Sequence, residues 1–335
     1  MISSRSLISM LMLATMMAIV VPAHAQPSAD EVLAATGFSA DEQQRILAGE
    51  LVSHDLKGVS ERDLSVSMGF IVKLAPDDLA KQIMAGTLSL SSEQRTARGD
   101  INGTGTLEDF AGLRLVPGGR ALAKTYLDAS AGDKLNLATD EIAAFHALQG
   151  QSDATQAVEQ QLRKLLLARY QSYRSSGLDG IPPYDRGGKS TDPATDLRKA
   201  SEAPLLKKFF PAAQRFLVDY PKATLPGLTE AFFWANNRID DQPTYALIHL
   251  LSTAEGAARM VIERQFYAGR SYNAAQAIVG LLPIQQGTLV VYGNHTFTDQ
   301  VTGFGGSAKQ SIGRHVMGSR LKDLFEKVRT AAVTQ

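Results

Sequence analysis

The hydrophobic pattern at the amino end of the chain predicts a helical segment, then two strands and a short helix. The helical segment contains a Ser-x-x-Glu capping box at 39–42, which is typical of a helix start. Residues 51–56 and 64–74 are predicted as strands, because apolar side chains alternate with serines in the second segment. A proline followed by two aspartates begins a helix over 76–85, since both residue types are favoured in a first helical turn.

The middle of the chain is irregular from 87 to 120 and strongly helical from 138 to 220. Asp153 is placed to cap the longest predicted helix, 154–175, whose leucines and tyrosines recur at helical spacing. Past residue 226 the pattern becomes rich in strands, in four segments: 244–252, 258–268, 272–282 and 288–299. A last helix follows a glycine-rich run, with a predicted apolar side of Ile312, Val316, Leu321, Leu324, Phe325 and Val328.

This order of elements predicts an α+β fold rather than alternating βαβ units. It resembles the START-like helix-grip superfamily, also called the polyketide cyclase or SRPBCC superfamily. In that superfamily an early strand and short helices precede an antiparallel meander, whose concave face grips the carboxy-terminal helix. Residues 64–85 are similar to the opening strand and helix, and residues 244–328 to the meander and the gripped helix.

The resemblance implies an antiparallel sheet that grips a long carboxy-terminal helix, with a large helical insertion. We therefore expect one α+β domain over 26–335. Its helix-grip core would comprise 26–120 and 225–335, and the helical insertion would comprise 121–224.

A second resemblance is to a set of exported bacterial proteins for which no activity is established. The shared motifs are Phe-Leu-x-Asp-Tyr-Pro at 216–221, the pair Phe233-Trp234, the strand end Ile248-His249 and Gln-x-Tyr-Ala at 265–268. In that set the last motif continues as Ser-His-Tyr, whereas this chain has Gly-Arg-Ser at 269–271. An activity that depended on the missing histidine would be absent here.

The first 25 residues have the pattern of a secretory signal peptide. Arg5 supplies a positive charge, 7–21 is uncharged and largely apolar, and Ala-His-Ala at 23–25 is a small-x-small cleavage site. We expect the mature chain to begin at Gln26, with no transmembrane segment after cleavage. The predicted location is periplasmic or secreted.

Composition excludes several classes of function for the chain of 335 residues. The 34 basic and 34 acidic residues balance, and no dense basic run occurs, which argues against nucleic-acid binding. The absence of cysteine excludes disulfides, thiolate metal sites and thiol catalysis. No pair of histidines has metalloprotease spacing, so we expect no metal, and no motif implies a cofactor.

Two motifs resemble ligand-binding loops but depart from their patterns. Gly-Gly-Lys-Ser-Thr at 187–191 lacks the earlier glycine of a phosphate-binding loop, because position 183 is proline. Residues 100–108 imitate the start of a calcium loop, but position 12 of that loop, Ala111, offers no carboxylate. Both are interpreted as ordinary turns. The chain also lacks the Gly-x-Ser-x-Gly of serine hydrolases.

His249 and His295 are candidates for acid–base catalysis or ligand binding. Each follows a run of apolar residues, and a charged imidazole in such surroundings is costly unless it has a partner. Glu263 and Arg264 interrupt another apolar segment. If these segments pair as a meander, the two histidines and one of these charged residues converge on one face, since successive strand side chains point to opposite faces. This predicts an acid–base or ligand-anchoring cluster of His249, Arg264 and His295. The alternative is a solvated outer face with satisfied core histidines.

Aromatic residues of the strand-rich region are candidates for lining an apolar pocket: Trp234, Tyr245, Phe266, Tyr267 and Tyr292. The leading expectation is an exported protein that binds an apolar, lipid-like small molecule in a helix-grip cavity. One alternative is a cyclase-like or hydrolytic enzyme of the same fold that uses the histidine–arginine cluster. The other is a cell-envelope interaction protein whose helical block docks a partner.

Overall fold

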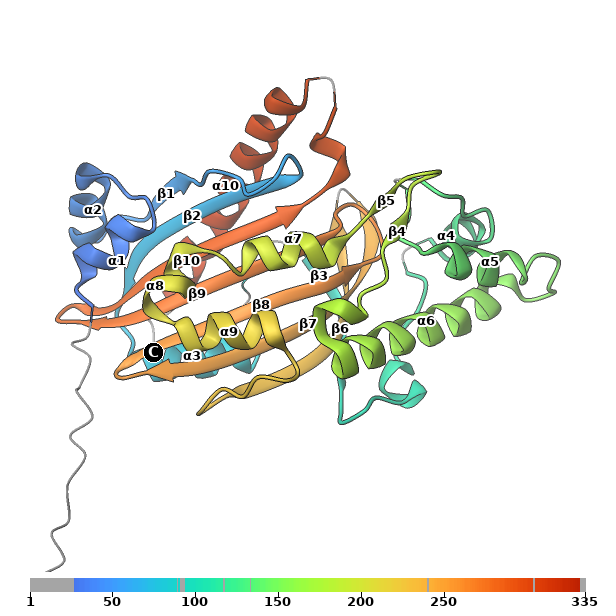
Figure 1. The fold of residues 1–335 in the computed structure, drawn as a ribbon, viewed down its shortest axis with the longest axis horizontal. Helices are drawn as coiled ribbons and strands as arrows, with labels where there is room; N and C mark the ends of the chain where they lie inside the picture. The colour runs from blue at the N-terminus through green and yellow to red at the C-terminus, as the bar shows by residue number, and fades with distance from the viewer. Residues whose placement is uncertain are drawn as a thin grey trace, which may run out of the picture.

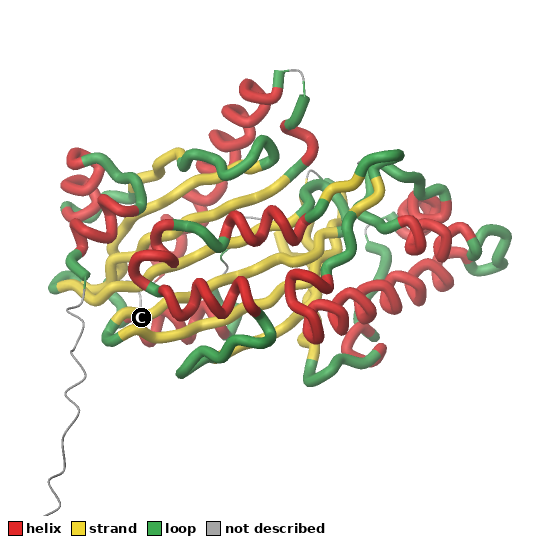
Figure 2. Tube along the Cα trace, in the orientation of Figure 1, coloured by secondary structure: helices red, strands yellow, loops and turns green. Residues whose placement is uncertain are grey.

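An antiparallel sheet of eight strands forms the centre of the computed structural model (Figures 1 and 2), which describes residues 27–88, 90, 94–116, 118–132, 134–239, 241–303 and 305–331. The strands are β1 (Val52–Asp55), β2 (Asp63–Val72), β3 (Gln94–Ile101), β6 (Thr229–Ile239), β7 (Gln242–Glu255), β8 (Ala258–Ala268), β9 (Ala274–Ile284) and β10 (Gly287–Phe297). They lie in the order β1-β2-β10-β9-β8-β7-β6-β3. The four strands from β7 to β10 form the predicted meander.

Ten α-helices lie in the described part of the chain: α1 (Ala29–Ala35), α2 (Ala40–Leu47), α3 (Pro76–Met84), α4 (Gly119–Leu127), α5 (Thr139–His146), α6 (Ala154–Ser176), α7 (Pro193–Ala200), α8 (Pro204–Phe209), α9 (Pro211–Asp219) and α10 (Gly306–Ala331). Asp153 caps α6 as predicted, because its carboxylate accepts a hydrogen bond from the backbone N–H of Gln156. Three 3-10 turns, η1 (Leu107–Phe110), η2 (Gly177–Gly180) and η3 (Asp299–Val301), and a small hairpin of β4 (Tyr184–Asp185) and β5 (Ser190–Thr191) complete the described elements.

Helices cover both faces of the sheet. Figure 1 shows α7, α8 and α9 crossing one face, with α10 and α3 behind the opposite face. Alternate residues of each strand divide between the two layers; on β8, Val261 packs toward α3 and α10, whereas Met260 and Ile262 pack toward the inserted helices. The α+β class, with a sheet against a long carboxy-terminal helix and helices inserted in the middle, is confirmed. The arrangement is compatible with a helix-grip fold.

Two strands were missing from the sequence-based prediction. β3 lies in the segment interpreted as irregular, and β6 precedes the predicted meander. β3 pairs with β6 at the far edge of the sheet and carries few apolar side chains. Its polar sequence, Gln-Arg-Thr-Ala-Arg-Gly-Asp-Ile, is tolerated because an edge strand is only partly covered.

The predicted apolar side of α10 is only partly correct. Leu321 and Phe325 are buried against the sheet, but Ile312 and Val316 are exposed. The helix instead turns Gly313 and Gly318 toward β2, where Leu64 and Val66 lie next to them. These glycines bring the helix close to the strand, so the amino-terminal half of α10 packs through them and through the half-buried Met317 rather than through Ile312 and Val316.

Candidate functional site

A row of polar side chains crosses the sheet face that the inserted helices cover. In the strand registers, His249 pairs with Arg264, Arg264 with Gln276, and Gln276 with His295. The structure therefore brings the three predicted cluster residues onto one face. Glu263 lies on the opposite face, among residues that α10 covers, so Arg264 is the charged member of the row.

His249 lies at one end of the row and is fully buried. The proton on Nε2 is donated to Glu230 at 3.1 Å, while Nδ1 accepts from the Tyr173 hydroxyl at 3.1 Å. Phe232 stacks on the ring at a centroid distance of 4.1 Å. Burial lowers the pKa of His249 to about 4, against the opposing effect of Glu230. The ring is therefore neutral near pH 7, with both nitrogens satisfied.

Arg264 connects the sheet to three inserted helices. Its guanidinium donates to Gln276 at 2.9 Å, to the Leu217 carbonyl at 2.8 Å and to the Ser201 hydroxyl at 2.9 Å. A longer bond of 3.4 Å reaches the hydroxyl of Tyr173. These contacts use four of the five N–H donors of a fully buried side chain, so Arg264 fixes the inserted helices on β8.

His295, at the other end of the row, borders a cavity. Its Nδ1 lies 2.9 Å from Asp63 Oδ2, which also accepts the backbone N–H of Val59 at 2.8 Å. Within the described residues, Nε2 of His295 has no hydrogen-bond partner. Although the side chain is only 5% exposed, it lines the cavity. Asp63 thus sets the orientation of the ring and leaves Nε2 available to a bound molecule.

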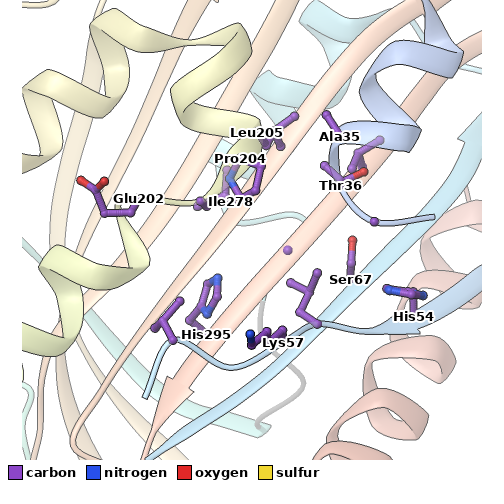
Figure 3. Close-up of a pocket in the computed structure, with 16 residues that line it drawn as sticks. Ala35, Thr36, His54, Lys57, Ser67, Glu202, Pro204, Leu205, Ile278 and His295 are labelled. Carbon is purple, nitrogen blue, oxygen red and sulfur yellow. The ribbon is translucent and has the colours of Figure 1, made fainter. Parts of the chain in front are cut away.

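The cavity has a volume of about 350 Å³ and lies between the sheet and the chain segments above β2, β10 and β9. Leu205, Ile278 and Val291 give it mainly apolar walls, and Ser67 and Gly293 also line it. Figure 3 shows the labelled side chains around the cavity. The turn after α1 and the start of α8 close its sides. Volumes in this range are typical of small-molecule sites.

The loop between β1 and β2 forms the remaining wall of this cavity, and an ion pair between a half-buried arginine and a buried aspartate holds its far end. Arg62 donates to both carboxylate oxygens of Asp196 on α7, at 3.1 and 3.0 Å. Asp196 is fully buried, and burial raises its pKa against the opposing effect of Arg62. The pair positions Asp63, the residue after Arg62, beneath His295.

The predicted aromatic residues belong to the packed interior and do not line this cavity. Trp234 and Tyr245 donate to the backbone carbonyls of Asp109 and Arg114. Phe266 stacks on Tyr173 at 4.1 Å, and the guanidinium of Arg169 lies 4.4 Å from the centre of the Tyr267 ring. Tyr292 lies on the other face of the sheet, where its hydroxyl donates to the Leu90 carbonyl at 2.9 Å.

The interface between the sheet and α10, where a helix-grip cavity was expected, is almost filled by side chains. Phe325 of α10 packs against Phe70 and Tyr292 at centroid distances of 5.1 and 4.8 Å. The spaces that remain beside these residues measure about 20 Å³ each, on the order of one water molecule. The larger cavity is therefore on the opposite face of the sheet.

Sequence reasoning found His295 but missed the other residues of the cavity. They come from separate segments whose patterns predict ordinary strands, turns and helix ends. One signal was available: Gly293 interrupts the apolar strand β10, and a glycine inside a strand marks a place where something approaches closely. A Cβ built on Gly293 meets no atom within 4 Å, because it would extend into open space.

The described residues contain no cluster of histidine and acidic side chains suited to a metal ion. In the same part of the chain, no helix has the length and apolarity needed to cross a membrane. The predicted signal peptide, 1–25, lies outside the described residues. Comparison with known protein families, with curated proteins and with solved structures finds no match to this chain.

Proposed function

We propose that this chain is an exported protein that holds a small, mainly apolar molecule in the cavity beside His295. The observation that carries the proposal is the cavity itself, about 350 Å³ with mainly apolar walls. Two other hollows, of about 390 and 490 Å³, have more polar linings. Concave, mainly apolar spaces of this size are typical of small-molecule sites, which favours the cavity beside His295.

The proposal includes a relationship of this fold to the helix-grip superfamily. Three features support the relationship: the antiparallel meander, the position of the opening strand β2 next to the last strand β10, and the packing of α10 on one face of the sheet. The ligand would nevertheless occupy the face under the inserted helices, because the face against α10 has little free space. The insertion would then supply one wall of the site, through residues 202–205 at the start of α8.

A second candidate function is catalysis at the same cavity. The observation that favours it is the Asp63–His295 pair, in which a carboxylate orients an imidazole whose free nitrogen faces the cavity. That arrangement suits a general base. His249, the other predicted base, has both ring nitrogens engaged and does not line this cavity. Turnover that is lost in His295→Gln and kept in His249→Gln would favour the enzyme over a carrier.

A docking role for the helical block has less support. Such a role would leave large apolar side chains exposed on residues 121–224. The exposed large apolar residues of the described chain are Val59, Leu107, Val116, Ile312 and Val316, all outside that range.

Filling the cavity from Gly293 tests the proposed function. Gly293→Ala and Gly293→Val add side chains into the open space without a steric clash at Cβ. Calorimetric titration with decan-1-ol, a probe of eleven non-hydrogen atoms, should give micromolar binding to the unmodified protein. We expect affinity to fall in Gly293→Ala and to fall at least tenfold in Gly293→Val.

The matched control is Thr229→Val, which places the same branched side chain at an exposed position of β6 outside the cavity. It should bind decan-1-ol like the unmodified protein. Equal binding by Gly293→Val and the unmodified protein would remove the cavity as the site.

A further inference from the structure

We propose that the molecule held in the cavity is an amphiphile with a carboxylate head, which His295 and Lys57 bind. This inference rests on the proposed function and adds the chemical class of the ligand. It follows from the contrast between the walls of the cavity and the few polar groups at its edge. Leu205, Ile278 and Val291 suit a hydrocarbon body, whereas the titratable side chains of the lining are mainly basic residue types.

His295 supplies a directed hydrogen-bond donor. The Nδ1–H of the ring donates a hydrogen bond of 2.9 Å to Asp63, so Nε2 is the ring nitrogen that remains for a ligand in the cavity. Asp63 is fully buried on the other side of the ring. In the proposed complex the ring takes up a second proton as the ligand binds, and Nε2–H then donates to a carboxylate oxygen of the ligand. The imidazole would then lie between two carboxylates, one from the protein and one from the bound molecule.

The charged side chains of the lining differ in whether they already have an ion-pair partner. Lys57 lines the cavity and has no ion-pair partner among the described residues. The acidic residue of the lining, Glu202, is paired with Lys207, and Figure 3 shows its carboxylate directed away from the other labelled residues. A carboxylate ligand would pair with Lys57, whereas a cationic ligand would face Lys57 unshielded.

His54, on the far side of the cavity from His295 in Figure 3, adds a second imidazole to the lining. Its Nδ1 lies 3.3 Å from Glu42 Oε1, so it too has its own carboxylate partner. The site therefore contains acidic groups only where each already has a basic partner: Asp63 with His295, Glu42 with His54, and Glu202 with Lys207. This pairing favours an anionic ligand.

A ten-carbon series with three heads tests the inference: decanoate, decan-1-ol and decylamine, titrated calorimetrically below the concentrations at which they self-associate. The hydrocarbon body is the same in each, and about 350 Å³ holds on the order of ten to fifteen non-hydrogen atoms. We expect decanoate to bind at least tenfold more tightly than decan-1-ol, and decylamine to bind most weakly.

Two variants assign the effect to the named residues. His295→Gln should weaken decanoate at least tenfold and decan-1-ol much less. Lys57→Gln changes an exposed residue, so folding should be unaffected, and it should weaken decanoate about fivefold and decan-1-ol much less. The control is Lys124→Gln, which removes the same charge from an exposed position on α4, at the opposite end of the molecule from α1 (Figure 1).

The outcomes separate this inference from the proposed function. If decan-1-ol binds and decanoate binds no more tightly, the cavity is a ligand site and the carboxylate head is wrong. The same conclusion follows if Lys57→Gln and His295→Gln both leave decanoate affinity unchanged. If no member of the series binds, the proposed function itself fails.

Discussion

His249 and His295 each have a carboxylate partner, yet their surroundings give them different roles. Tyr173 and Glu230 engage both nitrogens of His249, while one nitrogen of His295 faces the cavity. The sequence predicted both as candidates and could not separate them. The residues that distinguish the two histidines are distant in sequence: Tyr173 lies 76 positions from His249, and Asp63 lies 232 positions from His295. They meet the histidines only through the packing of helices and strands.

His249→Gln should remove a pH-dependent part of the stability. The folded-state pKa of about 4 lies below the ordinary value of 6.5, so the unfolded chain binds more protons between these values. Stability is therefore fully present above pH 6.5 and is lost as pH falls toward 4. Between pH 7 and 5 the loss from this one group is about 2 kcal/mol. Urea unfolding at both pH values measures it.

Glutamine keeps hydrogen-bonding groups at position 249 but does not titrate in this range. Between pH 7 and 5 the free energy of unfolding should therefore fall by about 2 kcal/mol less in the variant than in the unmodified protein. Its affinity for decan-1-ol should be unchanged, because His249 does not line the cavity. An identical loss of stability in the two proteins would mean that the histidine is not buried as a neutral ring.

At the scale of elements, the two glycines of α10 that face β2 predict different effects of alanine on stability. Gly318→Ala should raise the free energy of unfolding by about 0.5–1 kcal/mol, because alanine favours a helix over glycine. A Cβ at position 318 would lie 3.5 Å or more from Ser53 and Val66, which is ordinary contact. At Gly313 the same Cβ would lie 3.0 Å from both methyl carbons of Leu64, so Gly313→Ala should gain less or lose stability.

Urea unfolding of the two alanine variants checks this expectation. The comparison is internal, since both substitutions change the same residue type in the same helix. Equal stabilisation at both positions would contradict the close approach of α10 to β2.

Strong local patterns explain which elements the sequence predicted. The meander strands are long, largely apolar runs, and α6 repeats leucine and tyrosine at helical spacing. Both were predicted within a few residues. β3 was missed because an edge strand needs little apolar surface. The exposed side of α10 was assigned wrongly because Ile312 and Val316 fit a helical stripe, whereas close packing against β2 depends on Gly313 and Gly318.

At the scale of the whole molecule, the sheet separates two different interiors. The layer of α3 and α10 covers a nearly filled core, and the layer of inserted helices covers both the polar row and the cavity. No single segment of sequence carries the cavity, since its walls come from the amino-terminal helices, the loop after β1, two later strands and the start of α8. Residues this far apart meet only once the sheet has formed, which is why the cavity could not be predicted from local patterns.

Native mass spectrometry of residues 26–335 tests the central claim, that this cavity holds a small molecule. The protein is measured as purified without detergent and again after addition of decan-1-ol, beside Gly293→Val in the same conditions. We expect one bound molecule on the unmodified protein and none on the variant, whose added side chain occupies the space. A bare mass for the unmodified protein in both samples, or the same bound molecule on Gly293→Val, would contradict the account.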